Sequence, residues 1–400
     1  MQYVITDLEI NSELKRVEFL LDNNREAIEI HILDDEKLSV GDVYTGKVEK
    51  CLKNANGAFV NIGDETVYLQ LSKTDRVFYS HKFSKDNLLH QNDEVVVEIK
   101  NAGIKTKNPL ATSRFSLETK SLLLIYGDKG IKVSKKLPAD MKDEILSVFS
   151  EKANEIDDSI LDDTLIMVRS NANQSSVEEL VLEFESLLNN YLALTKKLVH
   201  LNPFTLVKKA KKHYIDNLIH TDSKVEKVVT DIKEVYEELV SNRELLPDFE
   251  IEFYESDFEL YKLYSLNQKM ERALKKYVDL KSGANITIES TEAMNVIDVN
   301  SANSSKVKSQ SKDDYFFKVN KEAAVEIARQ IRLRNLSGII VVDFINMKDE
   351  KLLDEIMSVL EREFRKDPLK VNVIDKTALG LVEITREKKF ASLKQQLTSQ

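Results

Sequence analysis

The sequence predicts a multidomain α+β protein, and three observations lead to that class. The chain has 400 residues, enough for two to four domains, and 42% of them are hydrophobic, as in folded proteins. Residues 1–117 consist mostly of short alternating strands separated by turns, which is typical of antiparallel sheets and small barrels. Residues 294–347 instead give a strand, a helix and a strand, which is typical of a parallel pair.

The first part of the chain predicts two all-β pieces. Residues 1–36 alternate apolar and polar side chains, as two or three strands of a meander that need a later partner to bury their face. Residues 37–117 predict five short strands and one long loop, the pattern of a small Greek-key barrel. Phe59 and Tyr68 lie on two of these strands, and the Tyr68 hydroxyl favours a partly wet place on the barrel surface. The alternative is that both are ordinary core aromatics.

The middle of the chain mixes strands and helices. Helices are expected around 140–149 and over 176–200, where Ser176 and Glu179 have the spacing of a capping box. Arg169 and Ser170 end a strand ahead of a polar loop and the second helix, an arrangement that can hold a phosphate. A simply solvated arginine is the alternative. Further along, a strand is expected at 249–254 and a helix at 261–277.

Two aspartates mark the parallel strand pair. Asp298 and Asp343 lie among or just after β-branched apolar runs, where an ionised carboxylate is costly unless it is paired or binds a metal. A helix is expected from about 321 to 335, with Asn320 as its N-cap. Parallel strands place their carboxyl ends at one sheet edge, so both carboxylates are expected to lie at that edge. Two carboxylates, with Asn300 two residues after Asp298, suit a hard divalent ion such as Mg²⁺. Alternatively, the aspartates cap strand ends or pair with an arginine.

The chain after Asp343 continues the α/β pattern. Residues 349–365 predict a helix whose apolar stripe faces the sheet and which Asp367-Pro368 ends. A strand is expected at 370–374.

Composition narrows the kinds of site that the chain can hold. A single cysteine, Cys51, excludes an internal disulfide and any multi-cysteine zinc site within one chain. The six histidines are scattered without metal-ligand spacing, which gives little support to nucleophilic catalysis by histidine. The net charge of −10 speaks against a generally basic coat, so phosphates would need local clusters. Without a secretory N-terminus or a membrane-length apolar run, we expect a cytoplasmic protein.

Several ordered segments resemble the catalytic part of the ribonuclease E/G family. These are TEAM at 291–294, IDVNSA at 297–302, NKEAA at 320–324, EIARQIRLR at 326–334 and GIIVVDFI at 338–345, with a closing segment at 380–386. The resemblance covers residues 1 to about 390 and is strongest over 286–347. It implies that Asp298 and Asp343 are Mg²⁺ ligands and that Asn300 supports the catalytic site by hydrogen bonding.

The resemblance also implies an architecture of nested subdomains. An RNase H-like scaffold without catalytic residues carries an S1-type OB-fold and a 5′-sensor subdomain as insertions, and a DNase I-like α/β catalytic subdomain follows. The corresponding ranges are 1–36 and 205–277 for the scaffold, 37–117 for the S1-type domain, 118–204 for the sensor, 278–390 for the catalytic subdomain and 391–400 for a tail.

Roles for further residues follow from the same resemblance. Phe59, Tyr68 and Lys107 correspond to residues that contact RNA, and the two aromatic residues would lie on the barrel surface as stacking platforms for bases. Arg169 and Ser170, with help from Lys370, correspond to the residues that sense a 5′-monophosphate. A lysine keeps the charge of the family's arginine but lacks its bidentate fork. A glycine that the family uses nearby is Thr119 here.

The predicted function is that of a Mg²⁺-dependent endoribonuclease acting on single-stranded RNA. Its expected substrates are rRNA precursors and mRNA, in processing or decay, and its products carry a 5′-phosphate and a 3′-hydroxyl. The alternatives are a noncatalytic RNA-binding protein of the same architecture in ribosome assembly or translation, and a Mg²⁺-dependent phosphodiesterase acting on DNA.

Two departures from the family pattern bear on that prediction. Asn346 stands where the family usually has a second aspartate. The CPxCxGxG-like zinc link is missing before the last residue, Gln400, so zinc-linked assembly is not expected. A homodimer through other surfaces remains compatible with the sequence.

Overall fold

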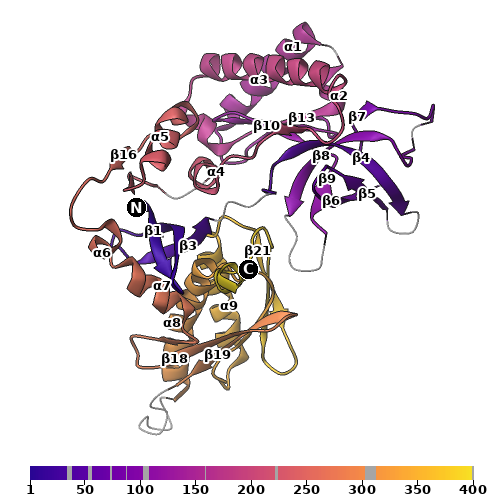
Figure 1. Cartoon of the computed structure of the whole chain (residues 1–400). Coiled ribbons are helices and arrows are strands. Elements are labelled where there is room, and N and C mark those ends of the chain that lie inside the picture. The colour runs from indigo at the N-terminus through magenta and orange to yellow at the C-terminus, as the bar shows by residue number, and fades with distance from the viewer. Residues whose placement is uncertain are drawn as a thin grey trace. The chain divides into compact units, whose positions relative to one another are not determined.

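A computed structural model describes the chain over residues 1–33, 38–52, 56–72, 74–86, 88–101, 108–157, 159–220, 224–301 and 312–398. The chain divides into two compact units (Figure 1). The first unit combines Met1–Asp35 with His213–Gln400, and the second is Glu36–Lys212. No helix among these described residues is long and apolar enough to cross a bilayer.

The first unit contains a five-stranded sheet in the order β16-β15-β1-β2-β3. The meander β1 (Gln2–Ile10), β2 (Glu13–Leu21) and β3 (Ala27–Leu33) is antiparallel. β15 (Lys227–Thr230) lies parallel to β1, and β16 (Glu250–Phe253) lies parallel to β15. The expectation that the first strands pair with a later part of the chain is therefore confirmed.

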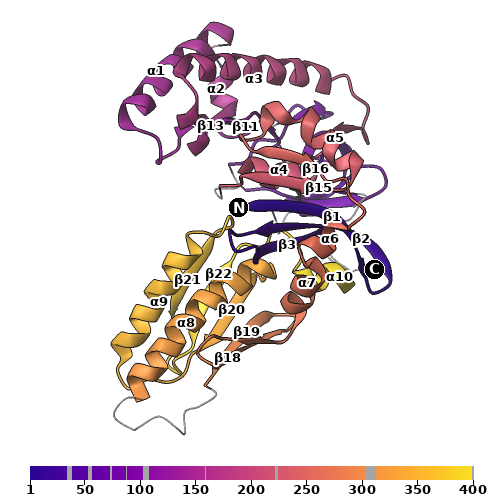
Figure 2. The same ribbon diagram turned by 90° about the vertical axis from the view of Figure 1, so that its left-hand side faces the viewer.

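Helices cover both faces of this sheet, as Figure 2 shows. Tyr3 and Ile5 point to the face under α4 (His213–His220) and α5 (Lys233–Ser241). Val4 and Leu8 point to the face packed by the other helices. Those helices are α6 (Leu260–Leu263), α7 (Leu266–Leu274) and α10 (Leu393–Thr398). The short η2 (Arg243–Leu245) follows α5.

The predicted helix over 261–277 was wrong as a single element. It breaks between α6 and α7 at Ser265, whose φ of 52° is left-handed and cannot continue a right-handed helix. Its end also differs, because Tyr277 begins strand β17 (Tyr277–Asp279). At the end of the chain, the predicted tail contains α10, whose Gln396 side chain accepts a hydrogen bond from the Ile32 amide at 2.9 Å.

A second sheet in the first unit has six strands in the order β17-β18-β19-β20-β22-β21. Its remaining strands are β18 (Asn285–Ser290), β19 (Met294–Asn300), β20 (Gly338–Asp343), β21 (Val371–Lys376) and β22 (Val382–Arg386). β19 and β20 are parallel, as predicted. One face packs on α8 (Lys312–Leu333) and α9 (Glu350–Phe364), which Figure 2 shows side by side.

The predicted helix start at Asn320 was wrong. α8 begins at Lys312, with Asp313 and Asp314 in its first turn, where carboxylates interact favourably with the helix dipole. Asn320 is therefore a buried residue in the helix interior rather than an N-cap. α9 behaves as predicted, and the Asp349 side chain caps its first turn.

The second unit contains a closed five-stranded barrel, as predicted for residues 37–117. Its strands are β4 (Val43–Leu52), β5 (Gly57–Asn61), β6 (Thr66–Gln70), β8 (Glu94–Asn101) and β9 (Leu110–Thr112). They pair in the order β4-β5-β6-β9-β8, and a β4–β8 pairing closes the ring. This arrangement is consistent with an OB-fold. β7 (Tyr79–His81) and β14 (Leu206–Lys208) extend the barrel at β8 and β4.

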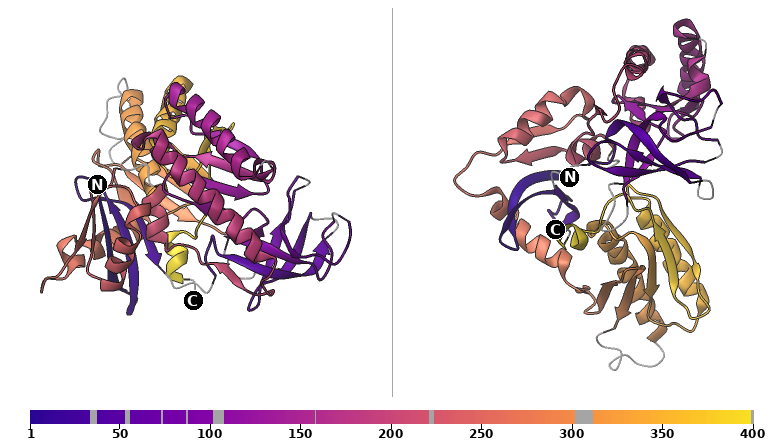
Figure 3. Two further views of the ribbon diagram at one scale, coloured as in Figure 1. Left: turned by 90° about the horizontal axis from the view of Figure 1, so that it is seen from above. Right: turned by 45° about the vertical axis from the view of Figure 1, so that its right-hand side comes forward.

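The same unit holds a four-stranded sheet in the order β10-β11-β13-β12. Its strands are β10 (Ser116–Glu118), β11 (Leu122–Tyr126), β12 (Gly130–Val133) and β13 (Thr164–Val168). The long helices α1 (Ala139–Ile156) and α3 (Val177–Leu198) pack together against it (Figure 3). The short helices are α2 (Ile160–Asp163) and η1 (Ser170–Gln174). The capping box of Ser176 and Glu179 is present as predicted.

Candidate active site

The two predicted metal-binding aspartates are direct neighbours across β19 and β20. Asp298 and Asp343 are register partners in this parallel pair. Successive side chains of a strand point to opposite faces, so the buried Ile297 and Val342 face the helices and the aspartates face the other side. Asp343 is exposed and Asp298 is half-buried, which places both carboxylates on an accessible face.

The sheet face that carries the aspartates is open along its length. Met294, Val296 and Ile339 alternate with inward residues on the same two strands, and they are 38%, 37% and 50% exposed. Large apolar side chains at such exposure leave room for a ligand to lie along the sheet. The acidic pair is therefore at the carboxyl end of an uncovered strand surface rather than in a closed pocket.

Asn300 lies beside the first aspartate and contacts it. Its Nδ2 donates a hydrogen bond of 2.7 Å to Asp298 Oδ2 and a longer one of 3.4 Å to Thr287 Oγ1. Thr287 is itself the cross-strand partner of Asp298 on β18. The amide thus holds one carboxylate oxygen, and the other oxygen stays available toward Asp343.

The pair lacks positive charge. Desolvation, and then the neighbouring Asp298 carboxylate, raise the pKa of Asp343. Within the described ranges neither aspartate forms an ion pair with lysine, arginine or histidine, so the interpretation as an arginine-paired strand end is not supported there. Two adjacent oxygen donors with uncompensated negative charge fit a hard divalent cation such as Mg²⁺, which keeps several waters as further ligands.

Asn320 positions the loop that follows Asp343, a role that the sequence analysis missed. From the interior of α8 its Nδ2 donates to the Ile345 carbonyl at 2.8 Å, and its Oδ1 accepts from the Ile345 amide at 3.0 Å. Together with the buried Phe344, these two hydrogen bonds fix the backbone just beyond the second aspartate. The signal was present as a polar residue on the apolar stripe of Ala323, Ala324 and Ile327.

The departure at Asn346 lies on this same loop. Asn346 is exposed, and its Oδ1 is 3.7 Å from the position that a Cβ on Gly380 would take. Gly380 has a φ of +85° in the turn before β22, which only glycine adopts easily. The loop after Asp343 thus presents a neutral amide where the family pattern has a carboxylate.

The predicted RNA-stacking residues are neighbours on the barrel. Phe59 on β5 and Tyr68 on β6 are cross-strand partners, and their ring centroids are 5.6 Å apart with the rings tilted by 55°. Both are half-buried, and they alternate with fully buried residues of the barrel core such as Val60 and Leu69. They therefore lie on the outer surface instead of in the core. Lys107 lies outside the described residues.

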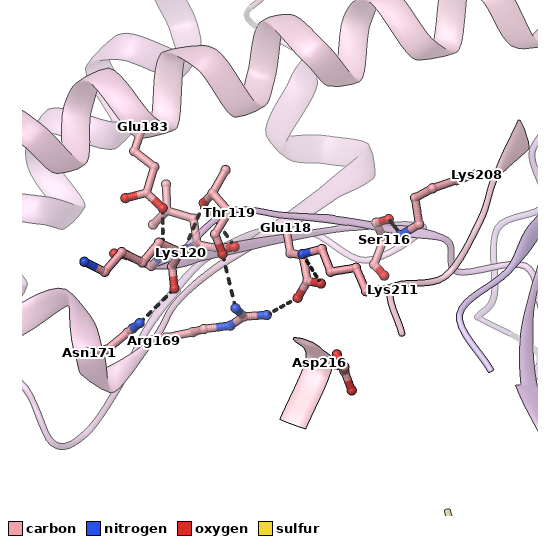
Figure 4. Close-up of polar contacts among 12 residues, drawn as sticks. Ser116, Glu118, Thr119, Lys120, Arg169, Asn171, Glu183, Lys208, Lys211 and Asp216 are labelled. Atoms are coloured by element: carbon pink, nitrogen blue, oxygen red, sulfur yellow. Dashed lines mark hydrogen bonds and ion pairs between the residues drawn. The ribbon is translucent and has the colours of Figure 1, made fainter. Parts of the chain in front are cut away.

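The predicted phosphate-sensing arginine already has a carboxylate partner (Figure 4). Arg169 Nη2 donates to Glu118 Oε2 at 2.6 Å, and its Nη1 donates to the Thr119 carbonyl at 3.2 Å. The other oxygen of Glu118 accepts from Lys211 Nζ at 2.8 Å. The side chains of Arg169 and Glu118 are 16% and 17% exposed, so only a small part of the pair is accessible. Sequence reasoning missed Glu118 because it lies on another strand.

The other two predicted sensor residues are placed as follows. Ser170 directly follows Arg169, begins η1 and is half-buried. Lys370 is exposed and belongs to the first unit, immediately before β21, where its carbonyl accepts from the Glu387 amide at 2.9 Å.

The chain is similar in sequence to a known protein family and to several of its members. Residues 116–389 match the model of the family described as Ribonuclease E/G family. The chain is 27% identical to Ribonuclease G of Escherichia coli K12, over 93% of this chain and 78% of that protein. It is 28% identical to Ribonuclease E of Nostoc sp. PCC 7120, over 87% and 51% of the two chains. It is 26% identical to a putative ribonuclease E of Buchnera aphidicola, over 94% and 93%.

Proposed function

Because this chain belongs to the ribonuclease E/G family, we propose that it is a Mg²⁺-dependent endoribonuclease that hydrolyses single-stranded RNA in the cytoplasm, with rRNA precursors and mRNA as substrates. The observation that carries the proposal is the register of Asp298 with Asp343 on an open sheet face. Two adjacent carboxylates that have no ion-pair partner among the described residues favour a bound cation, and a phosphodiester brought to that cation would lie along the uncovered strands.

Each residue of the site has a distinct part in this proposal. Asp298 and Asp343 hold the metal ion. Asn300 fixes the Asp298 carboxylate through its 2.7 Å hydrogen bond, and Asn320 fixes the backbone that follows Asp343. A bound Mg²⁺ supplies polarisation of a nonbridging phosphate oxygen and a water of lowered pKa. The expected products carry a 5′-phosphate and a 3′-hydroxyl.

The barrel supplies the general grip on RNA. Phe59 and Tyr68 present two adjacent aromatic faces on its outer surface, and unpaired bases stack on such faces with little regard for sequence. Base-paired RNA hides its faces within the duplex, so this platform favours single strands.

Recognition of a 5′-monophosphate requires an exchange of partners at Arg169. The Glu118 carboxylate occupies the guanidinium, and a terminal phosphate would take its place between Arg169 and Lys211. Because one anion replaces another, the net gain is small. We therefore expect a modest preference for 5′-monophosphorylated RNA.

The experiment that tests the proposal is cleavage of a short, internally labelled, single-stranded RNA with Mg²⁺ and with EDTA. Asp298→Asn and Asp343→Asn are compared with wild type and with Asp375→Asn, an exposed aspartate of the same sheet. Internal cuts that need Mg²⁺, vanish in the first two variants and persist in the third support the endoribonuclease. Equal cutting of single-stranded DNA would replace RNA as the substrate class.

A second candidate is a noncatalytic RNA-binding protein of the same architecture. Asn346 favours it, because the loop beside the acidic pair carries an amide in place of the carboxylate of the family pattern. This candidate predicts tight RNA binding, no cleavage with Mg²⁺, and no effect of Asp298→Asn on either quantity.

A further inference from the structure

Three side chains with metal-binding atoms meet away from the acidic pair. Glu18 on β2 is the cross-strand partner of His31 on β3, and His213 is the first residue of α4. One ligand atom of each lies within 4.8 Å of the others. All three belong to the first unit, although His213 is far from the other two in the sequence.

Glu18 is the unusual member of this group because it is a buried carboxylate. Its side chain is 1% exposed, and its carboxylate faces the Tyr3 hydroxyl and the His213 ring. Its partner is His213, whose Nδ1 forms an ion pair with Glu18 Oε1. A buried carboxylate that takes its counter-charge from one histidine suits a metal ion that can replace the proton of that histidine.

The charged residues around the group do not neutralise Glu18, because each cation has its own carboxylate. Three such pairs surround the histidines: Arg332 with Glu29 at 2.5 Å, Arg386 with Asp367 at 2.9 Å, and Lys389 with Asp216 at 3.2 Å. On the inner side lies the buried Tyr3, whose pKa is raised by burial and then by the Glu18 charge, so it remains a neutral hydroxyl. The negative charge of Glu18 is offset by His213: desolvation lowers the pKa of His213, but the Glu18 carboxylate raises it overall.

The two imidazoles are held side by side. Their ring centroids are 4.3 Å apart, and Phe390 packs edge-on against both, at 6.0 Å from His31 and 4.7 Å from His213. Burial, and then the neighbouring His213, lower the pKa of His31, so His31 is a neutral imidazole with a free lone pair at neutral pH. Both rings are half-buried, which leaves one side of the group reachable from solvent.

We propose that Glu18, His31 and His213 form a site for Zn²⁺ or a similar borderline divalent metal, separate from the Mg²⁺ site. Two imidazole nitrogens and one carboxylate are a donor set that zinc prefers and magnesium does not. Three protein ligands leave a fourth position for water. The metal would join β2 and β3 to the start of α4. In the sequence, the whole second unit lies between β3 and α4.

The test is the metal content of the full-length protein after exposure to Zn²⁺ and exhaustive dialysis. Wild type should retain one zinc ion per chain. His31→Gln and His213→Gln should bind Zn²⁺ on the order of 100-fold more weakly or worse, since even outer-shell partners cost 10–100-fold. His200→Gln, an exposed histidine, and the Asp298→Asn/Asp343→Asn double variant should retain zinc as wild type does. Equal zinc in all proteins, or loss in the double variant alone, overturns the proposal.

A measurement on wild type decides the question even if the histidine variants do not fold. Co²⁺ in a tetrahedral site of nitrogen and oxygen ligands absorbs visible light strongly, whereas octahedral Co²⁺ absorbs weakly. We expect one equivalent of Co²⁺ to give the strong spectrum, stoichiometric Zn²⁺ to abolish it and millimolar Mg²⁺ to leave it unchanged. A weak spectrum, or displacement by Mg²⁺, excludes the site.

Discussion

The two candidate sites for RNA phosphates differ in whether their charged side chains already have ion-pair partners. On the open sheet, Asp298 and Asp343 stand side by side with like charge and no ion-pair partner among the described residues. In the second unit, Arg169 is already matched by Glu118, which is matched in turn by Lys211. A site short of positive charge gains much from a cation. A site whose two cations already share one carboxylate gains only the difference between its old anion and the new one.

This contrast sets the size of the effects to be expected from mutation. In the proposed metal site each carboxylate of the acidic pair is one of two protein ligands, so we expect its loss to remove the metal and the chemistry with it. At Arg169, an incoming phosphate must displace a charge-assisted hydrogen bond of 2.6 Å before it forms its own. We therefore expect changes of several orders of magnitude at the first site and of severalfold at the second.

The largest effect is expected for Asp298→Asn and Asp343→Asn. Either variant should lower single-turnover cleavage of single-stranded RNA by roughly 10³-fold or more, since metal-ion stabilisation of the transition state is worth several kcal/mol. RNA affinity, measured by fluorescence anisotropy without cleavage, should stay within about twofold if the barrel contributes most of the binding energy, as proposed. A loss below about tenfold in cleavage would remove these residues from the metal site.

The next largest effect is expected on RNA affinity, when the aromatic residues of the barrel are removed. Phe59→Ala and Tyr68→Ala should each raise the Kd for single-stranded RNA about 10–100-fold, because base–aromatic stacking is worth about 1–3 kcal/mol per base. Tyr68→Phe keeps the ring and should bind nearly as wild type. The loss should be equal for RNA with a 5′-phosphate and with a 5′-hydroxyl. A loss confined to one of them would place these rings at the RNA terminus.

A smaller effect is expected when the site at Arg169 loses the carboxylate of Glu118. Glu118→Gln removes the charge that Arg169 and Lys211 share, so a terminal phosphate meets less competition. The ratio of cleavage rates for 5′-monophosphate over 5′-hydroxyl RNA should rise about 3–10-fold. Glu185→Gln, a half-buried glutamate of the same unit paired with Lys152, is the control and should leave the ratio unchanged. A falling ratio would show that Glu118 orders Arg169 for the phosphate.

The sequence predicted the acidic pair and missed what surrounds it, for a physical reason. β-branched apolar runs and a helical stripe specify strand, helix and strand locally, and parallel pairing then brings Asp298 beside Asp343. Glu118 contacts Arg169 across 51 residues, which no local periodicity records. His31 and His213 show no metal-ligand spacing in the sequence, yet they meet at Glu18 in the fold. Asn320 was assigned as an N-cap because asparagine favours that position, but its partner is the loop after Asp343.

The smallest predicted effect, on stability, tests the charge imbalance without any RNA. Desolvation and then the Asp298 charge raise the pKa of Asp343 above its ordinary 3.8, so the ionised form weakens the folded state. This penalty is absent below pH 3.8 and develops as the pH rises through the raised pKa. At pH 7 in EDTA, Asp343→Asn should therefore have a slightly higher Tm than wild type. The gain should be on the order of 1–2 °C, because Asp343 is exposed and solvent screens it.

Mg²⁺ should reverse the order of the Tm values of wild type and Asp343→Asn. A ligand that binds only the folded state stabilises it by RT ln(1 + [L]/Kd), and Asp343→Asn has lost one of the two carboxylates that would bind it. In saturating Mg²⁺, wild type should become the more stable protein, whereas Asp375→Asn should follow wild type in both buffers. If Asp343→Asn has the higher Tm in EDTA and wild type has the higher Tm in Mg²⁺, the charge of Asp343 needs a bound cation to be favourable. A variant less stable than wild type in both buffers would instead mark an Asp343 whose charge the fold already satisfies.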